Sequence, residues 1–205
     1  MPSLEMVLLF MGAALALNLT PGPDMLYVAA RSVSDGRAAG ILSAIGISVG
    51  LLFHVTALAL GLAALLAAVP LAYDLIRIVG AVYLLALGLD LLLRPRDAGE
   101  VALLPRSSFR AIFLQAVVTN VLNPKVALFF LAFLPQFVAP AAGSPVPQIV
   151  LLGLLFNVQG TLVNLAVALL AARTTVWLRA GQRRALLLQR VTGAVFVGLG
   201  ARLAI

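Results

Sequence analysis

The sequence has no cysteine, a single histidine (His54) and few charged residues, which make up only 10% of its 205 positions. The absence of cysteine excludes disulfides, thiolate metal sites and thiol redox chemistry, and one histidine argues against a transition-metal cluster. Hydrophobic residues make up 63% of the chain, and its mean hydropathy is +1.14. A soluble domain of this size could not cover itself with so few polar groups, so the composition predicts an all-α, polytopic membrane protein.

The same scarcity restricts the possible functions. A membrane enzyme or electron carrier needs a nucleophile pair, metal ligands, haem ligands or cysteines, and the composition argues against all of these. We therefore expect no enzyme activity, no metal and no cofactor. The formal net charge of +7 would suggest nucleic acid in a soluble protein, but the basic residues lie mostly between apolar runs. We expect a lipid bilayer as partner, and no nucleic acid.

Six apolar stretches have about the 20 residues that a membrane-spanning helix needs. They cover residues 4–30, 39–68, 71–93, 111–138, 147–172 and 186–204. The first has no basic residues before it and carries Glu5, so we interpret it as a retained span and not as a cleaved signal. We treat 1–205 as one transmembrane domain.

Charge in the links orients the predicted spans. Arginines gather in the links 31–38, 94–110 and 173–190, whereas the other links carry little or no positive charge. The positive-inside rule places the three arginine-bearing links in the cytoplasm and both termini outside. Arg202 is the one residue that departs from this pattern.

The two halves of the chain resemble each other. Two segments match, Gly50–Val55 in the first half and Gly153–Val158 in the second. The interval between them along the chain equals the interval between Pro21 and Pro124. We predict two three-helix repeats, at 1–94 and 111–205, joined by a cytoplasmic link at 95–110. Because each repeat has an odd number of spans, the second is inverted. Inverted repeats with broken helices at corresponding positions are typical of secondary transporters.

The first span is broken by prolines. Pro21 and Pro23, with Gly22 between them, interrupt the helix, which can restart with Asp24 in its first turn. A carboxylate is favoured there by the positive end of the helix dipole. Asp24 could therefore cap a helix near the membrane surface, or it could bind a substrate ammonium or carry a proton. Asn18, which precedes the break, joins Asp24 as a candidate for substrate binding.

The fourth span is broken in the same way. Asn123 is a good N-cap and Pro124 a good first residue for a new half-helix, and Lys125 then adds charge at its positive end. Such a site favours an anion, for example a substrate carboxylate, although Lys125 could also snorkel or pair with Asp24 for structure. Asn120, Asn123 and Lys125 are candidates for substrate binding. One acidic and one basic break together suit a zwitterion.

His54 and Asn157 occupy equivalent positions in the two repeats. Polar side chains in membrane spans usually form hydrogen bonds between helices, and this is the simpler interpretation of both. The sharper alternative makes His54 a proton relay. We therefore count Asp24 and His54 as candidates for proton coupling.

These motifs resemble those of the LysE/RhtB family of bacterial amino-acid exporters along nearly the whole chain. The resemblance rests on Asn-Leu-Thr-Pro-Gly-Pro-Asp at 18–24, Arg37 with Gly40, Gly46 and Gly50, Gly-Ala-Val-Tyr-Leu-Leu at 80–85, Asn-Val-Leu-Asn-Pro-Lys at 120–125, Phe129-Phe130 and Pro-Gln-Phe at 135–137. Ala116 departs from the glycine found there in many members.

The resemblance implies export of amino acids or close derivatives across the bacterial inner membrane, driven by the proton gradient. We expect alternating access around a central site, and a homodimer is compatible with six spans. An exporter of another small solute or cation, or a membrane scaffold that transports nothing, are the alternatives.

Overall fold

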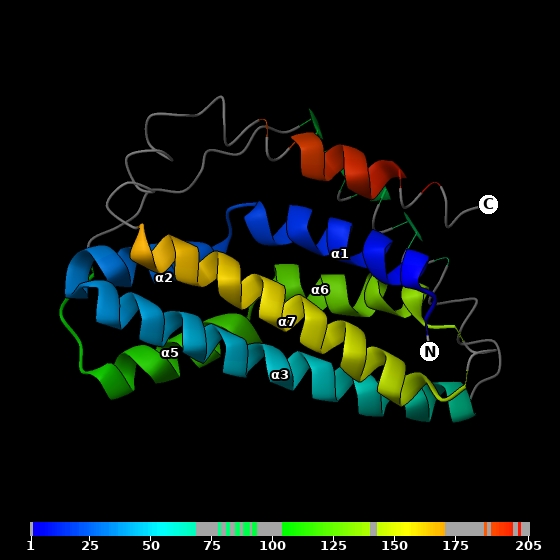
Figure 1. Ribbon diagram of the computed structural model, residues 1–205, viewed down its shortest axis with the longest axis horizontal. Helices are drawn as coiled ribbons and strands as arrows, with labels where there is room; N and C mark the ends of the chain where they lie inside the picture. Colours follow the sequence, from blue (N-terminus) through cyan, green and yellow to red (C-terminus); the bar gives the residue numbers. More distant parts are fainter. Residues whose placement is uncertain are drawn as a thin grey trace.

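The computed structural model describes residues 2–68, 104–139 and 143–170, together with parts of 78–93 and 187–201. Its elements are α1 (Leu4–Leu19), α2 (Pro23–Asp35), α3 (Arg37–Ala68), α5 (Phe109–Val121), α6 (Pro124–Ala132), the 3-10 turn η1 (Leu134–Phe137) and α7 (Pro145–Leu169). All are helical, which confirms the predicted all-α class for this part of the chain (Figure 1). Parts of the predicted third and sixth spans, and of the motif at 80–85, lie outside the described residues.

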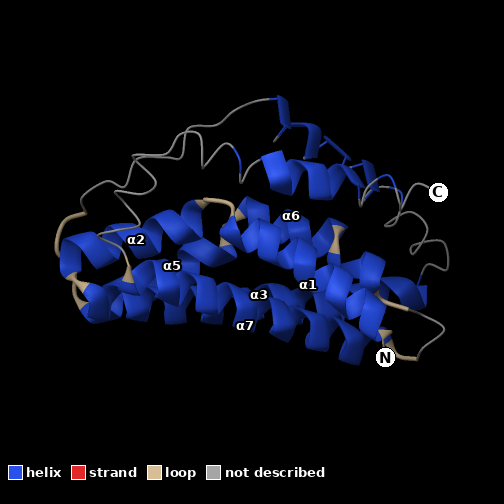
Figure 2. Ribbon diagram, turned by 45° about the horizontal axis from the view of Figure 1, so that its top comes forward, coloured by secondary structure: helices blue, strands red, loops and turns tan. Residues whose placement is uncertain are grey.

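Two helices are long and apolar enough to cross a membrane without a break. They cover Arg37–Gly61 and Pro145–Leu169, each with 25 residues. Helices α3 and α7 pack against each other, and α5 packs against the other side of α3 (Figures 1 and 2). This packing gives the second and fifth predicted spans the central place in the bundle.

Two further spans are bent pairs of shorter helices. The axes of α1 and α2 differ by 49°, and α5 is bent by 43° relative to Pro124–Phe137. Pro23 and Pro124 are the first residues of α2 and α6, while Pro21 and Gly22 form the connection before α2. The structure therefore confirms both predicted breaks and has up to four candidate spans within the described residues.

The predicted link at 31–38 was too long. Helix α2 continues to Asp35, and α3 begins at Arg37, so Gly36 alone connects them. Gly36 has a φ of +90°, a region that glycine enters without steric cost, so a single residue is enough to reverse the chain. Arg31 consequently lies within a helix, where it is buried.

Glycines let α3 approach α5 closely. A Cβ atom added to Gly46 would lie 2.7 Å from the Phe113 carbonyl oxygen, and one on Gly50 would lie 2.7 Å from that of Val117. Small residues allow such contacts between membrane helices, and the van der Waals packing that results stabilises the pair. These two glycines therefore serve the close packing of α3 against α5.

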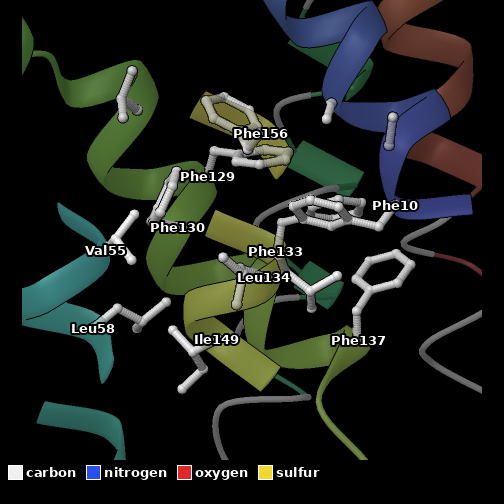
Figure 3. Close-up of a cluster of buried hydrophobic side chains, with 14 of the residues drawn as sticks. Phe10, Val55, Leu58, Phe129, Phe130, Phe133, Leu134, Phe137, Ile149 and Phe156 are labelled. Carbon is white, nitrogen blue, oxygen red and sulfur yellow. The ribbon is translucent and has the colours of Figure 1, made fainter. Parts of the chain in front are cut away.

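An aromatic cluster fills the space between α1, α6 and α7 (Figure 3). The ring of Phe10 lies 5.4–6.1 Å from those of Phe129, Phe133 and Phe137, and Phe156 from α7 lies 5.0 Å from Phe129. Tilted and edge-on rings at these distances attract each other beyond the effect of their burial. The cluster fixes the first half of one broken span against the second half of the other.

Candidate functional site

The two helix breaks meet, and two small cavities of about 30 Å³ each lie between them. All five side chains predicted to bind substrate line one or both: Asn18, Asp24, Asn120, Asn123 and Lys125. The cavities share the lining residues Asn18, Asp24, Val126, Phe156, Gly160 and Asn164. The structure therefore brings together side chains from both breaks and from α7.

Asp24 and Asn120 form the hydrogen bond that joins the two breaks. The Asn120 amide nitrogen donates to Oδ2 of Asp24 at 2.8 Å. The other carboxylate oxygen of Asp24 and the amide oxygen of Asn120 are both buried and have no partner. Buried polar atoms are nearly always hydrogen-bonded, and leaving one unpaired costs about 1–3 kcal/mol. Two acceptors without a donor leave a place for a group that donates hydrogen bonds.

Lys125 reaches across to the first break. Its Nζ donates to the carbonyl oxygens of Leu17, at 2.8 Å, and Thr20, at 2.6 Å. The structure describes both Lys125 and Asp24 and has no ion pair between them, which argues against the alternative in which the two pair for structure. Asn123 caps α6 as expected, since its side-chain oxygen accepts from the Lys125 backbone N–H at 3.0 Å.

Asn18 connects the first break to α7. Its amide nitrogen donates to Oε1 of Gln159 at 3.3 Å, and Gln159 donates in turn to the Met11 carbonyl at 3.2 Å. Gly160 makes room for it, because a Cβ atom there would lie 3.0 Å from the Asn18 side-chain oxygen. Asn18 thus lines both cavities from a fixed position.

His54 does not line either cavity. Its Nε2 lies 3.0 Å from the Asn120 carbonyl oxygen, so it contacts the backbone before the second break from outside the cavities. Its repeat counterpart Asn157 lines one cavity and exchanges two hydrogen bonds with Ser48, at 2.9 and 3.3 Å. Both residues therefore form the hydrogen bonds between helices that the simpler interpretation expects.

Helix α7 contributes more to the site than the sequence analysis assigned. Asn157, Gly160, Thr161 and Asn164 all line a cavity, and they are spaced like one face of a helix. That spacing, inside an otherwise apolar helix, was a signal that could have identified the face. Ser48, which also lines a cavity, carries no such signal, because a single serine in a span is common.

A second polar cluster lies in the half of the bundle formed by α2 and α5. Arg31, only 4% exposed, donates to Asp35 at 3.0 Å, to the Pro105 carbonyl at 2.9 Å and to Oε1 of Gln115 at 2.8 Å. Tyr27 accepts from Arg31 at 3.3 Å and donates to Gln115 at 3.2 Å. We call these five residues the arginine cluster.

The breaks separate this arginine cluster from the aromatic cluster. Along the chain, α1 and α6 carry the aromatic rings, and their partners across the breaks, α2 and α5, carry the arginine cluster. The cavities therefore lie between one region closed by hydrogen bonds and another closed by packed rings.

Comparison with known proteins identifies the family of the chain. The model of the LysE type translocator family matches residues 15–205. An uncharacterized membrane protein of Pseudomonas aeruginosa is 33% identical over 192 residues, which cover 91% of this chain and 88% of the relative. The homoserine/homoserine lactone efflux protein of Salmonella typhimurium is 30% identical over 191 residues, which cover 92% of this chain and 90% of the relative.

The protein of the same name from Salmonella typhi has the same identity and coverage. No solved structure matches the chain. The family and its named efflux relatives are transporters and not enzymes. Because the family model covers nearly the whole chain, both helix breaks included, the chain belongs to the family of LysE type translocators.

Proposed function

We propose that this protein exports amino acids or close derivatives from the cytoplasm, in exchange for protons, by alternating access at the site between the breaks. Membership of a translocator family and the efflux function named for two relatives support the direction and the class of solute. We further propose six spans in two inverted repeats in a bacterial inner membrane, with both termini outside. A homodimer is compatible with this arrangement.

The observation that carries the proposal is the pair of unpartnered oxygens on Asp24 and Asn120. An ammonium group has three N–H donors and a positive charge, so it can donate to either oxygen and pair with the carboxylate. We assign these two residues to the α-ammonium of the solute. Asn18 and Asn164, which line both cavities, are placed to bind its remaining polar groups.

The names of the relatives point to the same group. Homoserine and homoserine lactone share an α-ammonium, but the lactone has no free carboxylate because its carboxyl is a cyclic ester. A protein that exports both recognises what they share. We therefore place the required contact at Asp24, while Asn123 and Lys125 are further contacts for solutes that carry a carboxylate.

Of this pair of residues, the Asp24 carboxyl is also the candidate for proton exchange. Protonated Asp24 is a neutral donor, whereas ionised Asp24 attracts an ammonium, so the carboxyl holds either a proton or the solute. Mutual exclusion at one group is sufficient for antiport. His54, bonded behind Asn120, is the second candidate for proton coupling.

The size of the cavities indicates that the helices must move. Each holds about 30 Å³, close to the volume of one water molecule, whereas small-molecule sites typically measure about 300 Å³ or more. Loading therefore requires α2 and α5, or α1 and α6, to separate. We propose that the arginine cluster closes the cytoplasmic side and the aromatic cluster the outer side.

Efflux from proteoliposomes tests the proposal. The vesicles are loaded with labelled homoserine, a proton gradient is imposed, and the wild type is compared with Asp24→Asn, Lys125→Ala and the control Glu5→Gln, a carboxyl in the first turn of α1. We expect the wild type and the control to export and Asp24→Asn to lose export. Normal export by both site variants would show that the site is assigned wrongly.

The unpartnered oxygens also suit a small cation that is not an amino acid, which is the alternative within the transporter class. Competition experiments distinguish the two, because such a cation would inhibit homoserine efflux more strongly than any amino acid. A scaffold that transports nothing would show no flux for any solute.

A further inference from the structure

Helix α1 ends in carbonyl oxygens that point at a cation. Leu17 and Thr20, in its last turn and C-cap, accept from the Lys125 ammonium at 2.8 and 2.6 Å. The last carbonyls of a helix carry its partial negative charge, and the Leu17 carbonyl, which also accepts from the Thr20 backbone N–H at 3.1 Å, has a second lone pair for the ammonium. We propose that these two carbonyls form a binding site for a monovalent cation of the primary-ammonium type, and that the Lys125 side chain is its resident, tethered cation.

The surroundings of Lys125 leave room for its side chain and hold one of its acceptors in place. Gly22 lies beside the lysine, and a Cβ atom there would be 3.3 Å from both Cδ and Nζ, so glycine leaves the room that the stem needs. Thr20 is held in place, since its hydroxyl donates to the Ala16 carbonyl at 2.8 Å and pairs with the Thr192 hydroxyl at 2.6 Å. The carbonyl oxygen of Thr20 is therefore fixed where the ammonium meets it.

The site explains a charge that is otherwise misplaced. Lys125 lies in the first turn of α6, where the helix dipole disfavours a positive charge. It forms no ion pair with Asp24. Its side chain instead carries the charge to the C-terminal end of α1, where the dipole favours it. Lys125 is the only lysine of the chain, and it joins the two breaks by bonds that need no solute.

The site goes beyond the proposed function, because it concerns main-chain oxygens of α1 and not the oxygens of Asp24 and Asn120. It also has a mechanical consequence. A change of angle between α1 and α2 either breaks the two bonds of Lys125 or carries α6 with α1. The tethered ammonium thereby couples the movements of the two broken spans.

The test uses the absence of other cysteines, because Lys125→Cys introduces the only thiol. Alkylation of the purified variant with 2-bromoethylamine restores a side chain as long as lysine that ends in an ammonium. Alkylation with 1-bromopropane gives a neutral side chain of the same length. Mass spectrometry verifies both products, and the thermal unfolding midpoint is measured without any amino acid present.

We expect the aminoethylated protein to recover the wild-type midpoint, and the propylated protein to unfold several degrees lower. Equal midpoints for the two products would overturn the proposal. Should neither reagent reach the thiol, ethylammonium chloride decides, because it should raise the midpoint of Lys125→Ala more than those of Lys125→Met and the wild type. An equal rise in all three also overturns it.

These outcomes are separable from those of the efflux experiment. If the unfolding experiment contradicts the carbonyl site, the proposed ammonium site at Asp24 is not affected, since no solute takes part in that measurement. Loss of efflux in Asp24→Asn with normal recovery in the aminoethylated protein would support both sites independently.

Discussion

Replacing Arg31 by methionine removes the centre of the arginine cluster. Asp35, whose side chain is 9% exposed, would keep only the Ser107 backbone N–H, at 3.4 Å, among the partners that the structure gives it. Breaking a buried ion pair from one side costs about 3–5 kcal/mol, because the remaining charge is uncompensated. We therefore expect Arg31→Met to lower the free energy of unfolding by about 4 kcal/mol.

The double variant Arg31→Met/Asp35→Leu separates this charge from the other hydrogen bonds. It removes both charges and the two Arg31 hydrogen bonds to the Pro105 carbonyl and Gln115, a loss of about 1–3 kcal/mol, while these acceptors keep the longer bonds from Ser107 and Tyr27. The double variant should thus be more stable than Arg31→Met alone. Arg37→Met is the matched control, because Arg37 is exposed at the start of α3.

These differences in the free energy of unfolding are measured by reversible unfolding in mixed micelles, with circular dichroism reporting the helix content. A loss below about 1 kcal/mol for Arg31→Met would refute the reasoning, since that is the size of an exposed ion pair. The reasoning would also be refuted if the loss in the double variant equalled the sum of the losses in Arg31→Met and Asp35→Leu, because the two side chains share one charge interaction.

Three further predictions follow from packing and hydrogen bonding. Gly50→Ala should destabilise the protein and weaken solute binding in calorimetry, because its Cβ atom would lie 2.7 Å from the Val117 carbonyl and 2.9 Å from Cβ of Asn120. Gly61→Ala is the control, because no atom lies within 4 Å of the added Cβ, and it should change neither stability nor solute binding. Phe133→Ala should cost about 3–5 kcal/mol in the same unfolding assay, because the ring is buried among other rings. His54→Gln should keep proton-driven efflux, since glutamine can still donate to the Asn120 carbonyl, whereas His54→Leu should lose efflux. Loss of efflux in both variants would favour a proton relay at His54.

The breaks were predictable because proline acts on its own backbone. Pro23 and Pro124 begin new half-helices wherever they lie, and Asn123 caps the second one through a local bond. The candidate site residues, which the structure places around the cavities, could be chosen because few polar side chains occur in these spans. Local chemistry of this kind can be seen in the sequence.

The partners of those side chains could not be predicted. Lys125 binds main-chain carbonyls, which every residue possesses, so no residue type marked Leu17 or Thr20 as its acceptors. Arg31 was assigned to a link because arginines cluster there, and its burial depends on α2 continuing to Asp35. Packing between distant segments decided both cases.

The central claim is that the solute is held through its ammonium by Asp24. Calorimetry of purified protein in lipid nanodiscs tests it with homoserine, homoserine lactone and 4-hydroxybutyrate, which is homoserine without the amine. We predict that the wild type binds the first two and not the third, and that Asp24→Asn weakens both by about tenfold or more. An affinity of Asp24→Asn for the two amines equal to that of the wild type, or wild-type binding of 4-hydroxybutyrate as tight as that of homoserine, would contradict the claim.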